Sequence, residues 1–152
     1  MEQERVPVVA GWFTGGGGED FRLLGTRCRD CGSVFFPRED TFCRNPACDG
    51  TTLDETPLSR TGHIWSYTDA RYRPPAPYPS DPARPWQPYT LVAVELAAEK
   101  MVVLGQAAPG YGTDDLAVGM AVELVPGLIG ADGGDPGGPR ATWHWRPAGG
   151  AR

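Results

Sequence analysis

The segments Cys28-Arg29-Asp30-Cys31-Gly32 and Cys43-Arg44-Asn45-Pro46-Ala47-Cys48 contain all four cysteines of this chain. Each segment presents two thiols on one short turn, and two such turns facing each other form the tetrahedral set of soft ligands that zinc prefers. Gly32 directly follows the second thiol and permits the tight backbone of a metal-binding knuckle. The spacing therefore predicts a closed structural zinc site, without an open position for a substrate, whose ligands are Cys28, Cys31, Cys43 and Cys48.

Two other uses of the four thiols stay open at this point. Two disulfides would require an oxidising compartment, but residues Met1–Arg5 include acidic side chains and start no apolar segment of signal-peptide length. A four-thiolate iron centre of the rubredoxin type would make the chain an electron carrier. Such centres normally use two CxxC pairs, and the wider gap between Cys43 and Cys48 departs from that pattern. The residues thus favour zinc and a cytoplasmic protein.

Length and charge limit the classes of function. The chain has 152 residues, enough for one ordinary domain or for a small metal module with a domain of about 100 residues. No apolar run is long enough for a membrane span, so we expect no membrane partner. The net charge is −5, and thirteen Arg and one Lys are scattered among nineteen acidic residues. A nucleic-acid partner is therefore disfavoured, although a single-stranded nucleic-acid module remains the alternative function and a small arginine-lined anion site is compatible with this composition.

The composition changes along the chain and predicts four segments. Residues 1–20 are an N-terminal lead, in which Trp12-Phe13 suggests a helical turn and Gly15–Gly18 a hinge. Residues 21–50 form the zinc ribbon, which is too small for its own core and depends on metal for folding. Residues 51–147 form the second domain, and residues 148–152 are a tail.

The second domain reads as five β-strands. Each strand is rich in aromatic and β-branched residues; the five are Gly62–Thr68, Tyr89–Leu96, Met101–Gln106, Met120–Val125 and Ala141–Pro147. Asp114-Asp115 is expected to cap one helical turn between the third and fourth strands. Five strands in about 90 residues without an amphipathic helix indicate a small closed barrel such as an OB-fold. The predicted fold class is therefore all-β, with an N-terminal four-cysteine zinc ribbon followed by a five-stranded OB-fold barrel.

Two connections are unusually long. Residues 73–88 contain seven prolines with Tyr78 and Trp86 between them, which predicts a stiff extended loop and favours a docking surface. The stretch from Pro126 to Pro139 is rich in Gly and Asp and is interpreted as a flexible loop.

The order of these elements resembles one family, the zinc-ribbon plus OB-fold proteins associated with acyl-CoA enzymes and long catalogued as a domain of unknown function. The resemblance extends from about Trp12 to Pro147 and depends on several short motifs in a fixed order. These are Cys28-x-x-Cys31-Gly32, Phe36-Pro37-Arg38, Cys43 with Cys48, Ser66-Tyr67-Thr68, Leu116-Ala117-Val118-Gly119-Met120 and Trp145-Arg146-Pro147.

The resemblance implies a function in a heteromeric complex. Members of that family are partners of thiolase-fold enzymes, either acyl-CoA thiolases or synthases, or thiolase-like aldolases that cleave steroid side chains as CoA thioesters. A hydratase of hot-dog fold often accompanies the aldolases. The resemblance therefore implies an accessory subunit, with a steroid aldolase assembly favoured, that orders its partner and shapes or covers the acyl-CoA channel.

We expect no catalytic residue in this chain. The cysteines are assigned to zinc, and the only imidazoles, His63 and His144, lie on predicted strands. The sequence contains no nucleophile elbow, phosphate-binding loop or dinucleotide fingerprint.

The remaining candidate site residues surround the proline-rich loop. Guanidinium groups suit the phosphates of CoA and an aromatic ring can stack on adenine, so the candidate CoA contacts are Arg71, Arg73, Arg84 and Trp86. Trp, Tyr and Arg are also typical of protein interfaces, so the candidate partner contacts are Tyr72, Tyr78 and Trp86. Trp143 and Trp145 share one predicted strand face and are expected to close the barrel core or to present a patch to the partner.

Overall fold

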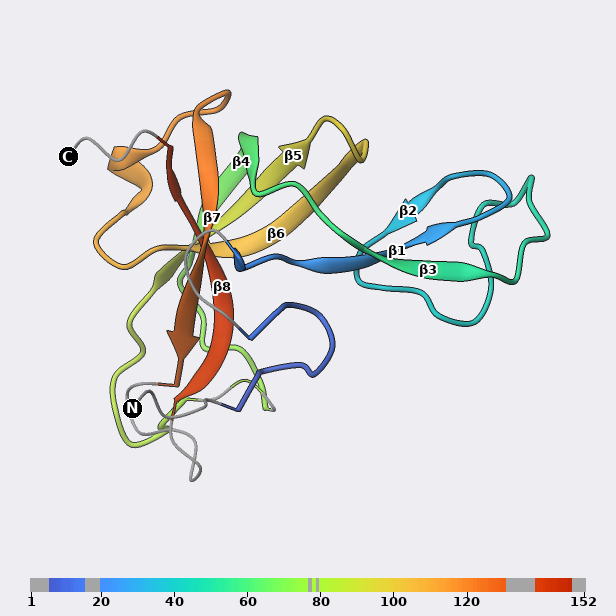
Figure 1. The fold of residues 1–152 in the computed structure, drawn as a ribbon. Coiled ribbons are helices and arrows are strands. Elements are labelled where there is room, and N and C mark those ends of the chain that lie inside the picture. Colours follow the sequence, from blue (N-terminus) through green and yellow to red (C-terminus); the bar gives the residue numbers. More distant parts are fainter. Residues whose placement is uncertain (1–5, 16–19, 77, 79, 131–138, 149–152) are drawn as a thin grey trace.

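A three-stranded ribbon projects from a closed barrel (Figure 1). The computed structural model describes residues 6–15, 20–76, 78, 80–130 and 139–148. No α-helix occurs in this part of the chain, so the all-β prediction is confirmed. The expected helical turn around Asp114 is the 3-10 helix η2 (Thr113–Asp115). No helix among the described residues combines the length and the apolar character that crossing a bilayer requires.

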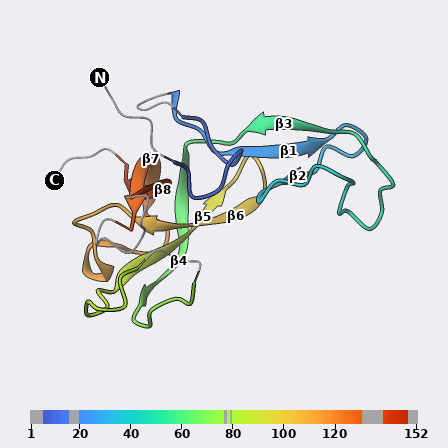
Figure 2. The ribbon, with the colours of Figure 1, turned by 90° about the horizontal axis from the view of Figure 1, so that it is seen from below.

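The ribbon is an antiparallel sheet in the order β2-β1-β3, formed by β1 (Leu24–Cys28), β2 (Val34–Phe35) and β3 (Leu53–Pro57). β1 runs away from the barrel and β3 returns beside it (Figure 2). β3 was not among the predicted strands, and the ribbon was expected to end at residue 50. Because β3 pairs with β1 along its whole length, the ribbon sheet extends to Pro57. The sequence Leu-Asp-Glu-Thr-Pro is too polar and too exposed to stand out as a strand.

The barrel contains the five predicted strands. Their bounds are β4 (Thr61–Ala70), β5 (Tyr89–Leu96), β6 (Met101–Ala107), β7 (Ala121–Ile129) and β8 (Arg140–Pro147). The order is β4-β5-β6-β8-β7, and β7 closes the barrel against β4. All neighbours are antiparallel except β6 and β8. This is a five-stranded Greek-key barrel, and the prediction of an OB-fold is confirmed.

β7 is longer than predicted. The flexible loop was expected to begin at Pro126, but the strand continues to Ile129 and Pro126 pairs with Trp143 of β8. β4 pairs with β7 only over Ala121–Glu123, so β7 has a single neighbouring strand at Pro126. A proline, which has no N–H to donate, is tolerated at such an edge. Residues 131–138 of the expected loop and residues 16–18 of the expected hinge lie outside the described residues.

Apolar side chains from every barrel strand fill the interior. They are at most 2% exposed and include Ile64, Val92, Val94, Leu96, Val103, Val122, Leu124 and Trp145. Phe21, Leu23 and Leu58, which flank the ribbon sheet in sequence, belong to the same core. Burial of this apolar surface is the main stabilising contribution to the barrel.

Trp143, unlike Trp145, packs outside this core. Its ring belongs to a cluster with Trp12, Phe13 and Phe36, here called the ring cluster, in which centroids lie 5.4 to 6.3 Å apart. Its indole Nε1 donates to the carbonyl of Leu104 at 3.0 Å. The ring cluster therefore joins the N-terminal lead, the ribbon and the barrel.

The described part of the lead consists mainly of bends, a turn and two isolated β-bridges and contains no helix, so the expected helical turn is wrong. Trp12 accepts a hydrogen bond from the backbone N–H of Leu24 at 2.7 Å, and Val8 donates to Ala141 at 2.8 Å. The lead is therefore attached both to the ribbon and to β8.

Candidate metal centre and partner surface

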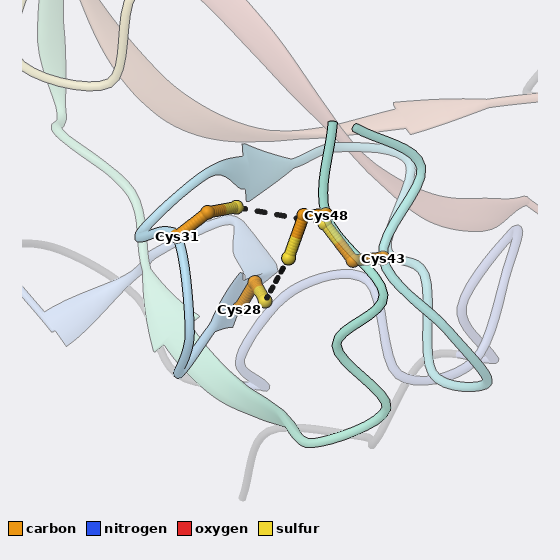
Figure 3. Close-up of side chains that lie close together, drawn as sticks. All are labelled: Cys28, Cys31, Cys43 and Cys48. Carbon is orange, nitrogen blue, oxygen red and sulfur yellow. Dashed lines mark hydrogen bonds between the residues drawn. The ribbon is translucent and has the colours of Figure 1, made fainter. Parts of the chain in front are cut away.

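The four cysteine sulfurs converge at the end of the ribbon farthest from the barrel (Figure 3). Cys28 and Cys31 come from the end of β1 and the turn after it, and Cys43 and Cys48 come from the loop between β2 and β3. All four Sγ atoms lie within 4.8 Å of one another. The structure thus brings together the complete predicted ligand set.

The sulfur separations fit a metal ion and not disulfides. Sγ of Cys28 lies 3.8 Å from that of Cys48, and Sγ of Cys31 lies 3.6 Å from that of Cys43. A disulfide bond would bring two sulfurs to about 2.05 Å. Zinc bound to four sulfurs at about 2.3 Å requires sulfur–sulfur edges of about 3.8 Å. The donor set and its spacing therefore match a structural zinc site with all four positions taken by protein.

The backbone supports this arrangement. Gly32 has a positive φ of 78°, as expected for the residue after a knuckle, and its N–H donates to the carbonyl of Cys28 at 2.9 Å. On the other turn, the N–H of Gly50 donates to Sγ of Cys48 at 3.3 Å. A Cβ atom at Gly50 would lie only 2.7 Å from Sγ of Cys28. Gly50 therefore leaves space that the sulfur cluster needs.

The surroundings of the thiols differ from one ligand to the next. Burial raises the pKa of the Cys43 thiol to about 12. A hydrogen bond with the Ser33 hydroxyl, 3.2 Å away, lowers the pKa of the exposed Cys31 to about 6. A divalent cation stabilises the thiolate form of every ligand and overrides such differences.

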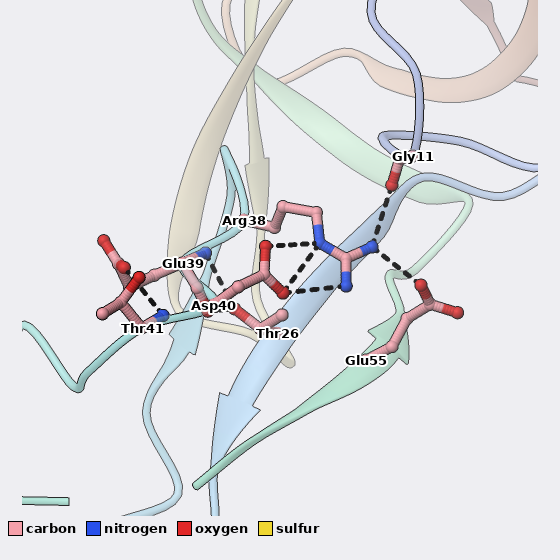
Figure 4. Close-up of polar contacts among 7 residues, drawn as sticks. All are labelled: Gly11, Thr26, Arg38, Glu39, Asp40, Thr41 and Glu55. Carbon is pink, nitrogen blue, oxygen red and sulfur yellow. Dashed lines mark hydrogen bonds and ion pairs between the residues drawn. The ribbon is translucent and has the colours of Figure 1, made fainter. Parts of the chain in front are cut away.

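Polar contacts fix the chain that leads into the second pair of ligands (Figure 4). The buried hydroxyl of Thr26 on β1 donates to the carbonyl of Glu39 at 2.7 Å and accepts from its N–H at 3.0 Å. Arg38 donates to the Glu55 carboxylate on β3 at 2.7 Å and to the carbonyl of Gly11 in the lead at 2.9 Å. These bonds hold the loop after β2 against both the sheet and the lead.

The proline-rich loop is held together by its first residue, Arg73. Its guanidinium donates to the Ser80 hydroxyl at 2.8 Å and to the carbonyls of Asp81 at 2.9 Å and Arg84 at 2.5 Å. The same group lies 5.6 Å from the ring centroid of Trp86. The loop is therefore folded around Arg73, whose donors bind the loop itself.

The structure brings three of the six candidate contact residues around one hollow. The rings of Tyr78, Trp86 and Tyr89 pack at 5.8 to 5.9 Å, and Trp86 Nε1 donates to the carbonyl of Ala70 at 2.8 Å. Beside these rings lies a hollow of about 460 Å³. Tyr78, Arg84 and Trp86 line it, together with Leu128 and Ile129 of β7.

The other candidate contacts do not line this hollow. Arg71 is exposed and lies 3.4 Å from the Asp69 carboxylate. Tyr72 is 90% exposed, the highest value among the exposed large hydrophobic side chains. Its ring is therefore available to a partner.

A second exposed apolar surface was not predicted. A β-bulge between Ile64 and Ser66 places an extra residue, Trp65, in β4, and its side chain is 61% exposed. Val102 and Leu104 of β6, which is separated from β4 by β5, are exposed as well. We call these three residues the outer apolar face. Because successive side chains of a strand point to opposite faces, the residue after an inward-facing Ile64 could have been predicted to face outward.

An N-terminal four-cysteine ribbon joined to an OB-fold barrel defines a class of two-module zinc proteins, and comparisons place this chain within it. The family model for the ChsH2 rubredoxin-like zinc ribbon domain matches residues 16–54. A DUF35 domain-containing scaffold protein of Methanocaldococcus jannaschii is 31% identical over 118 residues, which cover 77% of this chain and 76% of that protein. The solved structure of an Ltp2-ChsH2(DUF35) aldolase has a chain with 28% identity and a TM-score of 0.58, matched over 84% of this chain and 85% of its own. The chain therefore belongs to the DUF35 family, and the family resemblance seen in its sequence is confirmed.

Proposed function

We propose that this chain is a non-catalytic accessory subunit of an acyl-CoA carbon–carbon lyase or thiolase complex. One observation carries the proposal: the chain resembles, over both of its modules, a DUF35 chain solved as part of an aldolase. Its similarity to a DUF35 scaffold protein points in the same direction. The partner would be a thiolase-fold subunit, with a thiolase-like aldolase favoured.

The chemistry of the chain agrees with an accessory role. Four thiolates fill the coordination sphere of a zinc ion and leave no position for a substrate. His63 is exposed on β4, and His144 is buried on β8. Zinc would hold the ribbon in shape, and the bond-breaking chemistry would belong to the partner.

The partner would dock on two exposed apolar surfaces, Tyr72 and the outer apolar face. Large contiguous apolar patches are rare on a monomer, and Trp and Tyr are frequent energetic centres of interfaces. Tyr72 and Trp65 are 90% and 61% exposed. Docking on these residues would give both rings the burial that they lack here.

The proposal also specifies the class of substrate. We propose the CoA thioester of a steroid side chain, with a hot-dog-fold hydratase as a further member of the assembly. CoA would reach the hollow beside the proline-rich loop, where Arg84 could bind a phosphate and Trp86 could stack on the adenine. Arg73 would act indirectly, because its donors hold the loop together.

Co-expression with thiolase-like proteins encoded in the same genomic neighbourhood tests the proposal. We expect one of them to co-purify with this chain and to lose solubility or activity without it. Tyr72→Ala and Trp65→Ser should each weaken the complex by about tenfold or more, the effect of losing an interface centre worth about 1.4 kcal/mol. Val118→Ala is the matched control, because Val118 is 70% exposed but lies outside both surfaces.

Two results would contradict the accessory role. One is a thiolase-fold partner that is soluble and fully active alone. The other is carbon–carbon bond cleavage by this chain in the absence of any partner.

A further inference from the structure

A second hollow, of about 490 Å³, lies on the barrel away from the proline-rich loop. Its walls come from the outer side of β7 and β8, from the segment after β6 and from the segment just before β4. The polar side chains that line it are Arg60, Tyr111, His144 and Arg146, and the apolar ones are Ala108, Pro109, Val125 and Pro126. None of these side chains is acidic, although the chain as a whole carries a net charge of −5.

His144 lies in this wall with its ring unusually close to the backbone of β7. Its side chain is buried, with 4% of the residue exposed, and its ring lies directly against Gly127 of β7. A Cβ atom at Gly127 would come within 2.3 Å of Nδ1 of His144. Only glycine at this position leaves room for the imidazole. The barrel thus accommodates a buried polar ring at this position.

Two polar atoms in the wall lack a hydrogen bond. Within the part of the chain that the structure describes, Nε2 of His144 and Nε of Arg60 are buried and have no partner. Leaving such atoms unpaired is costly, and native structures keep few of them without a reason. The two residues that carry these atoms line the same hollow.

Arg60 can present its guanidinium to a ligand in this hollow. The residue is only half-buried, and its guanidinium is held by a long hydrogen bond of 3.3 Å from Nη2 to the carbonyl of Leu124. Because Arg60 and His144 line the same hollow, a ligand there can contact both side chains. Arg146 is already oriented by the Glu123 carboxylate, 2.8 Å from its Nε.

From these observations we infer that the hollow is a binding site for a small organic anion. Its oxyanion head, a phosphate or a carboxylate, accepts hydrogen bonds from Arg60 and His144. The volume exceeds that of the head group alone, so the rest of the molecule lies on Pro109, Val125 and Pro126. This inference does not depend on the proposed partner or on CoA in the other hollow.

The two histidines of the chain provide the test. In the zinc-loaded protein, the imidazole NMR signals of His63 and His144 can be assigned with a His63→Asn variant. Inorganic phosphate and propionate are titrated separately, and the tighter ligand identifies the head group. We expect the His144 signal to shift to saturation while the exposed His63 stays unchanged. Burial lowers the pKa of His144 in the free protein, and a bound anion should raise this pKa.

Variants separate the site from general charge effects. Arg60→Gln should weaken binding by about tenfold or more, as expected for loss of a hydrogen bond to a charged group. Arg146→Gln removes a second cation that lines the hollow, already paired with Glu123, and should weaken binding less than Arg60→Gln does. Arg71→Gln, which removes an exposed cation outside the hollow, should have no effect. The inference is overturned if neither anion shifts His144, or if both histidines shift together without saturation.

Discussion

The ribbon and the barrel obtain their stability from different sources. Between Leu24 and Pro57, the only buried apolar side chains are those of Cys28 and Cys43, both candidate metal ligands. The barrel instead buries an apolar core contributed by all five of its strands. A small sheet without a core can project far from the domain because a metal ion replaces the missing core. The ribbon and the barrel should therefore respond differently to removal of zinc and to a cavity in the apolar core.

Removal of zinc should have the largest effect and should be confined to the ribbon. Structural zinc contributes about 10–16 kcal/mol in zinc-finger peptides, far more than the ribbon's other contacts can supply. With a strong chelator, or in Cys48→Ser, backbone NMR signals of residues 24–57 should lose their dispersion while barrel signals persist. If the ribbon and barrel signals lost their dispersion at the same chelator concentration, the two modules would not have separate sources of stability.

The reverse perturbation is a cavity in the barrel core. Leu124 on β7 has no exposed surface, and Leu124→Ala should lower the free energy of unfolding of the zinc-loaded protein by about 2–5 kcal/mol. Leu104→Ala on β6, where the side chain is 55% exposed, should change it by less than about 0.5 kcal/mol. Urea unfolding measures both. Zinc affinity should be unchanged in either variant, and a loss in Leu124→Ala would argue against separate sources of stability.

A smaller effect is expected from crowding the sulfur cluster. In Gly50→Ala, the new Cβ would lie 2.7 Å from Sγ of Cys28 and displace a ligand. Zinc affinity should fall by about tenfold, or about 1.4 kcal/mol, in a competition titration with a chromophoric chelator. The control is Gly112→Ala, because Gly112 has open space at the Cβ position and an ordinary φ of −112°. Equal affinity in the two variants would show that Gly50 has no role in the site.

The smallest predicted effect concerns the ring cluster that joins the two modules. Phe36 of the ribbon side and Trp143 of β8 meet edge to face, with centroids 5.7 Å apart. A double-mutant cycle with Phe36→Ala and Trp143→Ala should give a coupling energy of about 0.5–1.5 kcal/mol. Additive effects in urea unfolding would mean that the cluster does not couple ribbon to barrel.

Much of this contrast could be predicted from sequence, because both modules carry local signals. Thiol spacing indicated the four ligands, and runs of β-branched and aromatic residues indicated the five barrel strands. β3 was missed because a strand stabilised by pairing with β1 needs no apolar pattern of its own. The prediction ended β7 too early, at the residue before Pro126. A proline fits in the strand there because β7 has only one neighbouring strand at that point, and this is known only from the sheet topology.

The sites outside the metal centre depend on contacts between distant segments. Arg73 and Arg84 look equivalent in sequence, but the fold turns the first inward to bind the loop and leaves the second on the wall of a hollow. The approach of His144 to Gly127 joins two strands whose register could not be derived from either segment alone. Local patterns therefore indicate the elements, and long-range packing determines which side chains remain available for binding.

The accessory role is tested most directly by reconstituting the complex from separately purified components. The thiolase-like partner is assayed for carbon–carbon bond cleavage of a steroid side-chain CoA thioester while this zinc-loaded chain is added. The account predicts that activity rises and saturates at a fixed molar ratio, that this chain alone has none, and that the Trp65→Ser variant must be added at about tenfold higher concentration for the same rise. Activity that is independent of this chain, or cleavage by this chain alone, would contradict it.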